Sequence, residues 1–178
     1  VIGGGNAAID SARVALRKAA EVHLFYRRDK EDMPAIEEEI AAAEEEGVKI
    51  HCLAAPIQII GENGKVKSIK LVRMGLNEFD KTARKVARPT EGSEFLFDVD
   101  TVIEAVGQAP DSSFPAGNGL GLTKNGWVLV DQRTMATNIK GVFAGGDAVS
   151  GPATVTDAIS AGMRAAFSIK RFLEGDES

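Results

Sequence analysis

The fold of this chain is decided by its opening stretch, Val1-Ile2-Gly3-Gly4-Gly5-Asn6-Ala7-Ala8, in which two β-branched residues run into a glycine turn. In the pattern Gly3-x-Gly5-x-x-Ala8, the first glycine permits a tight turn and the second lets a phosphate group approach the backbone. The small residue Ala8 allows the following helix to pack closely on the strand. We predict a dinucleotide site here that includes Asn6, which is expected to cap the helix, and Ala7. The pattern alone also fits a plain glycine-rich turn.

Helices and strands are expected to alternate after this turn. Residues 9–18 and 35–46 have helical spacing, the second segment with an acidic face and a stop at Gly47, whereas residues 22–26 and 48–53 are typical of strands. This order predicts an α/β fold with a Rossmann-like doubly wound parallel sheet. Residues 57–74, interrupted by the turn Gly-Glu-Asn-Gly, predict an antiparallel β-hairpin insertion.

The later part of the chain has more glycine and proline between its apolar segments. We expect a loop over residues 77–92, strands over residues 95–99, 101–106 and 127–130, and a final helix over residues 154–173.

Two arginines follow the second predicted strand, in Tyr26-Arg27-Arg28. A fold of this kind that is specific for NAD places an acidic residue at this point to bind the ribose 2′-hydroxyl. Guanidinium groups instead suit the 2′-phosphate of NADP, because their planar donors match phosphate oxygens. We therefore assign Arg27 and Arg28 to NADP(H) binding; the alternative is that they pair with nearby acidic residues on the surface.

A second glycine turn lies in the stretch from Thr137 to Asp147. The apolar run Val-Phe-Ala at 142–144 predicts a strand that is buried on both faces, and the glycines after it allow a ligand to approach the backbone. The carboxylate of Asp147 can accept hydrogen bonds from sugar hydroxyls. This layout is typical of a site for the ribityl chain of a flavin, formed by Gly146 and Asp147.

The spacing of a Thr, six residues and Ala-x-Gly-Asp resembles the C-terminal FAD motif of flavoproteins that have two dinucleotide-binding domains. The stretch at 151–163 and the Tyr-Arg-Arg and Met-Pro residues near position 30 resemble the glutamate synthase small-subunit branch. The resemblance implies an NADPH-binding domain over residues 1–113 and the C-terminal strand-helix segment of an FAD-binding domain over residues 114–178.

The resemblance also implies four further site residues. Gly107 and Pro110 are similar to the segment that returns to the flavin domain, where the glycine admits the nicotinamide end of the cofactor. Thr154 and Val155 begin a helix whose positive end would lie near the pyrimidine edge of the flavin, where it would stabilise negative charge.

In that family NADPH passes hydride to FAD, and electrons continue through iron-sulfur clusters to a partner, such as a large amidotransferase or synthase subunit. The cysteine clusters and the FAD glycine fingerprint lie upstream in the family, so this chain is expected to hold FAD poorly and not to turn over alone. Exposed apolar surface is expected to favour a homodimer. Open alternatives are a ferredoxin-NADP reductase, a dihydropyrimidine-dehydrogenase-like subunit, or a non-catalytic docking module that uses the acidic helix.

Composition narrows the classes of function. The chain has 178 residues, 44% of them hydrophobic, and a net charge of −5, which argues against nucleic acid as a partner. Its apolar runs are shorter than the roughly 20 residues that cross a bilayer, so we expect no membrane and a cytoplasmic location. The single cysteine, Cys52, excludes a CxxC pair within this sequence. His23 and His51 are expected to be structural, and no catalytic side chain or metal ligand is predicted.

Overall fold

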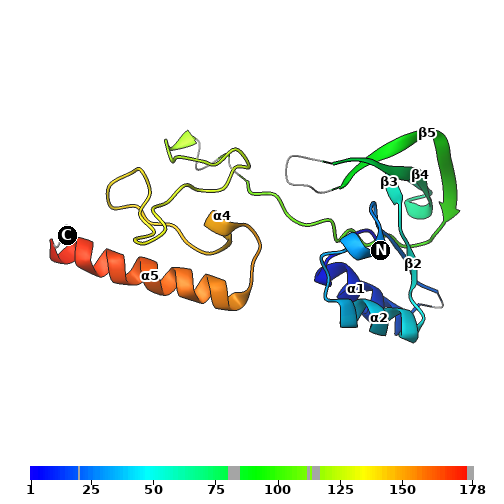
Figure 1. Ribbon diagram of the computed structural model, residues 1–178, viewed down its shortest axis with the longest axis horizontal. Coiled ribbons are helices and arrows are strands. Elements are labelled where there is room, and N and C mark those ends of the chain that lie inside the picture. Colours follow the sequence, from blue (N-terminus) through cyan, green and yellow to red (C-terminus); the bar gives the residue numbers. More distant parts are fainter. Residues whose placement is uncertain (20, 80–84, 112, 114–116, 176–178) are drawn as a thin grey trace. The chain divides into compact units, whose positions relative to one another are not determined.

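The chain divides into two compact units, Val1–Gly107 and Gln108–Ser178. The computed structural model describes residues 1–19, 21–79, 85–111, 113 and 117–175 (Figure 1). The predicted domain boundary after residue 113 adjoins residues 114–116, which lie outside the described residues. The assignment of the two parts to NADPH and FAD remains a prediction.

The first unit is built on a short parallel sheet. Strand β1 (His23–Phe25) pairs in parallel with β2 (Lys49–His51). Ile2 forms parallel bridges to Phe25 on one side and to Glu104 on the other. The resulting order, β2 then β1 then Ile2 then Glu104, is the order 3-2-1-4 of a Rossmann sheet. The predicted strand at 101–106 is therefore reduced to one bridge at Glu104.

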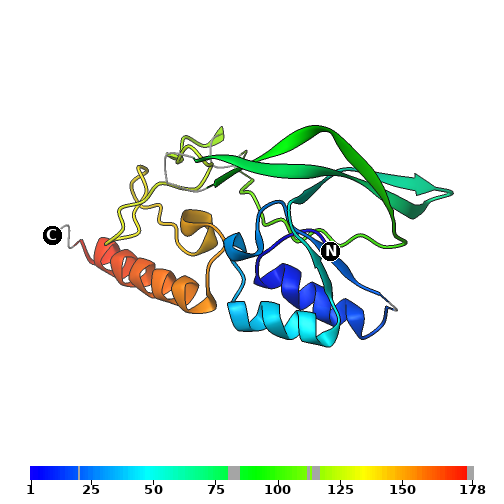
Figure 2. The same ribbon diagram turned by 45° about the vertical axis from the view of Figure 1, so that its right-hand side comes forward.

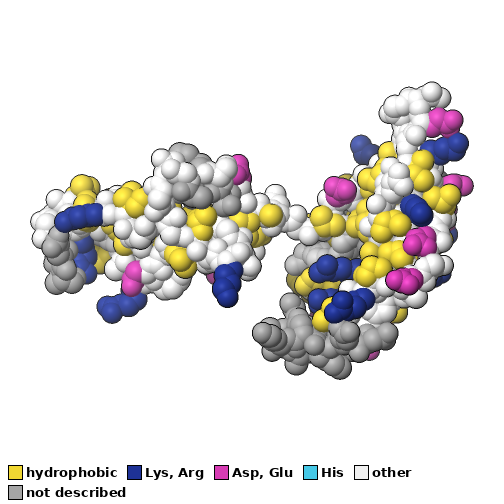
Figure 3. Space-filling view, turned by 90° about the horizontal axis from the view of Figure 1, so that it is seen from above, with side chains coloured by type: hydrophobic (Ala, Val, Ile, Leu, Met, Phe, Trp, Pro, Cys, Tyr) yellow, Lys and Arg dark blue, Asp and Glu magenta, His cyan; other side chains and the backbone are white. Residues whose placement is uncertain are grey.

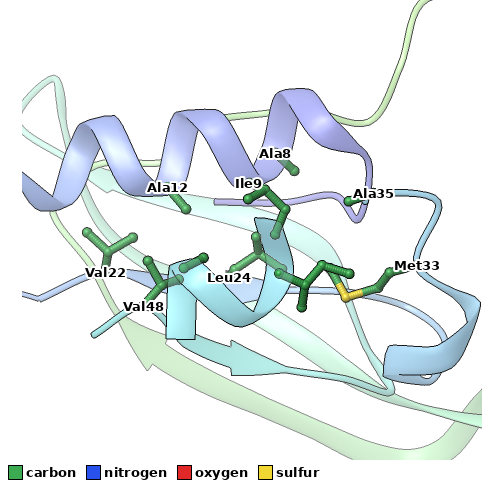
Figure 4. Packing of buried hydrophobic residues seen from close by; sticks show 10 residues of the cluster. Ala8, Ile9, Ala12, Val22, Leu24, Met33, Ala35 and Val48 are labelled. Atoms are coloured by element: carbon green, nitrogen blue, oxygen red, sulfur yellow. The ribbon is translucent and has the colours of Figure 1, made fainter. Parts of the chain in front are cut away.

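Two helices cover one face of this sheet (Figure 2). Helix α1 (Asn6–Leu16) follows the glycine turn, and α2 (Glu37–Glu46) follows the short 3-10 turn Lys30–Asp32 and ends at the left-handed Gly47. Leu24 of β1 is fully buried between the sheet and the helices. Figure 4 shows the packing of this core, which consists of Ala8, Ile9, Ala12, Val22, Leu24, Met33, Ala35, Ile40, Ala43 and Val48.

A three-stranded antiparallel sheet packs on the other face, formed by β3 (Ala54–Glu62), β4 (Lys65–Phe79) and β5 (Lys85–Asp98) in that order. Asn63 and Gly64 both have positive φ in the turn between β3 and β4, as the Asn-Gly sequence predicts. The second core contains Ile2, Phe25, Ala54, Ile69 and Leu71. The α/β class and the antiparallel hairpin are thus confirmed, with a sheet rather than helices on this second face.

The loop predicted over residues 77–92 is wrong, because β4 continues to Phe79 and β5 begins at Lys85; residues 80–84 lie outside the described residues. The outer parts of β4 and β5 pair with each other, and the backbone hydrogen bonds of this pairing stabilise strands of polar sequence. Such strands lack the apolar face from which a strand is predicted. In Figure 3, hydrophobic side chains of this unit lie among charged ones, and Ile57, Ile59 and Leu96 are exposed.

The second unit has little sheet. Among its described residues, the strand pairing consists of an antiparallel bridge from Leu122 to Val128 and another from Ala136 to Phe143. The prediction of a doubly buried strand at 142–144 is wrong, because Val142 is 37% exposed and a single bridge leaves no sheet to cover it. Two helices follow, α4 (Asp147–Ser150) and α5 (Val155–Glu174). The described part of the chain contains no helix with the length and apolarity that a membrane crossing requires.

Candidate functional site

The glycine turn after Ile2 is closely packed at its first position. Gly3 has φ of +140°, and a Cβ atom placed there would lie 2.2 Å from the carbonyl oxygen of Ala105. The small Ala8 on α1 is fully buried against the same turn. Gly3 and Ala8 therefore let strand, helix and the neighbouring strand approach one another, as the sequence pattern predicts.

Gly5 differs, because the protein itself leaves space beside it. Its φ is −91°, which any residue adopts, and a Cβ there would meet only Cγ of Pro34, at 4.0 Å. Gly5 is also the N-cap of α1, and no described side chain caps this helix end. Since the first-turn N–H groups of a helix have no partner within the helix, the positive end of α1 is available to an anion. The space beside Gly5 and the uncapped helix end fit a pyrophosphate.

Asn6 does not cap α1, so that prediction is wrong. It is the first helical residue, and its Oδ1 accepts a hydrogen bond from the backbone N–H of Ile36 at 2.9 Å. The N-cap is Gly5 instead, because the helix begins at Asn6 itself, one residue earlier than a capping role for Asn6 would require. Ala7 is exposed in the same first turn.

Arg27 and Arg28 follow β1 with different surroundings. Arg27 is exposed, whereas Arg28 is partly buried and its Nε is fully buried without a hydrogen-bond partner. The ion pairs among the described residues include neither arginine, so surface pairing with acidic neighbours is not observed. A buried N–H that lacks an acceptor is costly, and the described residues supply none for this Nε. Because Arg27 is exposed and Arg28 is only partly buried, their guanidinium groups could hold a phosphate at this strand end.

The predicted groups of the first unit share one edge of the parallel sheet. Gly3 N–H donates to the carbonyl of Phe25 at 3.1 Å, and Ala105 N–H donates to the carbonyl of Ile2 at 2.8 Å. The glycine turn, the arginine pair and Gly107 each follow the carboxyl end of one of these three adjacent strands. Gly107 has φ of +91°, and a Cβ there would have no neighbour within 4 Å among the described residues. Ligands of open α/β sheets bind at this edge.

The second unit presents the other glycine turn. Gly146 has φ of 64° and ψ of −149°, a conformation reserved for glycine. A Cβ on the preceding Gly145 would lie 3.3 Å from Cβ of Ala161, so α5 packs directly on the turn. The exposed Asp147 and the partly buried Pro110 both line a pocket of about 290 Å³ that Trp127 also borders.

Helix α5 begins with a complete capping box. Thr154 Oγ1 accepts a hydrogen bond from Asp157 N–H at 3.2 Å and donates to Asp157 Oδ2 at 2.6 Å. The hydrogen bond from Thr154 lowers the pKa of Asp157 below its ordinary value. Both side chains are therefore committed to the helix end, and a ligand there would meet the backbone N–H of the exposed Val155.

Sequence reasoning missed several contacts between residues far apart in the chain. His23 Nδ1 lies 2.8 Å from His51 Nε2, and the two rings stack 5.0 Å apart beside Phe97. The two histidines meet because β1 and β2 are adjacent parallel strands. Their positions in these two predicted strands are the only sequence signal from which the contact could have been predicted.

Within the described ranges, no group of three or more side chains that could hold a metal ion lies together. Cys52 is partly buried, which raises the pKa of its thiol.

A parallel sheet with a glycine turn after one strand and arginines after the next is typical of nucleotide-binding α/β proteins. The chain matches the family described as pyridine nucleotide-disulphide oxidoreductase over residues 1–162, and it belongs to that family. It is therefore a member of a family of NAD(P)-dependent flavoprotein oxidoreductases.

Relatives and solved structures agree. The chain is 47% identical to the NADP(+)-dependent formate dehydrogenase subunit beta of Moorella thermoacetica, covering 97% of this chain and 24% of that protein. It is 42% identical to the glutamate synthase [NADPH] small chain of Azospirillum brasilense, covering 97% of this chain and 36% of that protein. The crystal structure of Lactococcus lactis thioredoxin reductase matches with a TM-score of 0.79 and 26% identity, over 98% of this chain and 52% of that one. The predicted resemblance to the glutamate synthase small-subunit group is thus confirmed.

Proposed function

We propose that the first unit binds NADP(H) at the carboxyl edge of its parallel sheet. In this arrangement the pyrophosphate lies at Gly5 and the first turn of α1, the 2′-phosphate lies on Arg27 and Arg28, and Gly107 admits the nicotinamide end. The observation that carries the proposal is the open space beside Gly5 at an α1 N-terminus that no described side chain caps, with Arg27 and Arg28 following the adjacent strand. When bound, NADPH supplies a hydride.

We propose further that Gln108–Ser178 contributes part of an FAD site in a longer protein. Gly146 and Asp147 would hold the ribityl chain, and the N–H of Val155 would face the pyrimidine edge. The chain spans 24% and 36% of the two curated relatives described above, so the remaining FAD groups and any iron-sulfur clusters would belong to other sequence. Electrons would pass to a partner subunit, since both relatives carry names of subunits. We expect the chain alone to bind FAD weakly and to be inactive.

The alternative of a docking module through the acidic helix has less support. Glu39 and Glu46 of α2 both bind Arg13 of α1, and Glu44 pairs with Lys30. These three glutamates form ion pairs between elements of the same unit, so their charges are already paired within the chain rather than left for a partner protein.

Calorimetric titration with NADPH and with NADH tests the proposal, using an Arg27→Ala/Arg28→Ala double variant. Charge-assisted hydrogen bonds contribute about 1.5–3 kcal/mol each, so NADPH should bind at least about tenfold more tightly than NADH, and the variant should lose that preference. Arg17→Ala is the matched control, because Arg17 is an exposed residue at the opposite end of α1. Equal affinity for the two nucleotides in the unaltered chain would contradict the proposal.

A further inference from the structure

The segment of residues 26–36, here called the strap, carries both arginines and lies against the glycine turn. The ring of Tyr26 covers Gly4 so closely that a Cβ on Gly4 would lie 2.4 Å from Cε2 of the ring. The hydroxyl of the same tyrosine donates to the carbonyl of Asp32 at 2.7 Å. Tyr26 therefore touches the turn with its ring and closes the loop containing the arginines with its hydroxyl.

Two hydrogen bonds tie the far end of the strap to the same turn. Ala35 N–H donates to the carbonyl of Gly4 at 3.1 Å, and Ile36 N–H donates to Oδ1 of Asn6. Two residues of the strap itself, Met33 and Ala35, are each only 8% exposed and pack in the core beside α1 (Figure 4). Both ends of the strap are thus held, and the ion pairs of the described residues leave out the arginines between them.

We propose that Tyr26 is a positioning residue that fixes the two arginines relative to the glycine turn and thereby sets the selectivity for a nucleotide with a 2′-phosphate. This inference rests on the proposed function. A bound nucleotide must meet the turn with its pyrophosphate and the arginines with its 2′-phosphate at one fixed separation. A strap that already holds this separation saves the free energy of ordering the loop when the ligand binds. Asn6 contributes to the same arrangement through Ile36 and need not touch the ligand with its side chain.

The test is a Tyr26→Phe variant, which keeps the ring over Gly4 and removes only the hydroxyl. The affinity for NADPH should fall about two- to tenfold, the range expected for one lost hydrogen bond, whereas the affinity for NADH should stay within about twofold. Amide exchange measured without nucleotide should be faster at Ala35 and Ile36. Ser93→Ala is the matched control, because it also removes a hydroxyl that donates to a backbone carbonyl, that of Thr90, on the antiparallel sheet.

A double-mutant cycle completes the test. In the Arg27→Ala/Arg28→Ala background, Tyr26→Phe should have no further effect on NADPH affinity, because the tyrosine acts through the arginines. An equal loss for NADPH and NADH, an additive loss in this background, or unchanged NADPH affinity would overturn the positioning role. If instead the unaltered chain shows no preference for NADPH, the proposed function itself fails, so the two failures are distinguishable.

Discussion

Replacing Gly3 and replacing Gly5 should have different consequences. The first change should destabilise the fold, and the second should weaken nucleotide binding. Gly3→Ala places a methyl group 2.2 Å from the Ala105 carbonyl oxygen, which is backbone and cannot rotate away. It also puts a non-glycine residue at φ of +140°. Backbone strain of about 1–3 kcal/mol and overpacking of about 1–3 kcal/mol together predict a loss of roughly 2–6 kcal/mol. Urea unfolding followed by circular dichroism measures this loss.

Gly64→Ala is the control for Gly3→Ala. Gly64 also has positive φ, 75°, but in the described part of the chain a Cβ there would have no neighbour within 4 Å. Only strain applies, so the expected loss is about 1 kcal/mol. If Gly3→Ala costs no more than Gly64→Ala, the close approach of the turn to Ala105 is refuted.

Gly5→Ala should leave the fold intact and weaken nucleotide binding. Its φ of −91° suits alanine and the added methyl would meet only Pro34, so the stability should change by less than about 1 kcal/mol in either direction. The methyl group would occupy the space assigned to the pyrophosphate, which NADPH and NADH share. Calorimetry should therefore show weaker binding of both nucleotides, by about tenfold or more. Unchanged affinity in a folded Gly5→Ala protein would refute the assignment of the turn.

Three further changes test other contacts. Burial, and then the charges of His23 and Lys49, lower the pKa of His51 below 6.5, so the unfolded chain binds more protons and stability should fall as pH drops through about 6.5. His51→Gln should flatten this dependence in urea titrations from pH 5 to 8. Thr154→Ala removes the cap of α5 and should cost about 1 kcal/mol in thermal unfolding, with no loss if the cap is absent in solution. Arg28→Leu should leave stability unchanged or raise it by about 1 kcal/mol, because it removes the unsatisfied Nε, while NADPH binding weakens; a destabilised variant would show that Arg28 is structural.

The fold was predictable where its signals are local. The Gly3-x-Gly5-x-x-Ala8 pattern, the Asn63-Gly64 turn and the helix start at Thr154 each act within a few residues, and the two turns and the helix are present. The extents of β4 and β5 were not predictable, because pairing between strands, which a polar sequence does not reveal, supports their outer parts. The expected strand at 142–144 failed for the converse reason, since an apolar run forms a buried strand only where a sheet covers it.

The site residues were predictable as residue types and less so in their roles. The sequence indicated arginines after the second strand, and Arg27 is exposed there while Arg28 is partly buried. The role of Asn6 was not visible, because its partner Ile36 lies 30 residues away and is joined only when the strap folds back on the turn. The same holds for the ring of Tyr26 on Gly4, which requires two adjacent strand ends to meet.

The strap also places Arg28 in surroundings that the sequence motif does not reveal. Its Nε and the Oδ2 of Asp32 are both buried in this segment without a partner among the described residues, and each such atom costs about 1–3 kcal/mol. A loose loop would relax and let water satisfy both atoms. Tyr26, Ala35 and Met33 hold the strap to the turn and to the core, so this relaxation is opposed and the two atoms stay unsatisfied. Buried groups without a partner call for an explanation, and a strap kept rigid for a ligand, as the proposed function requires, would be one.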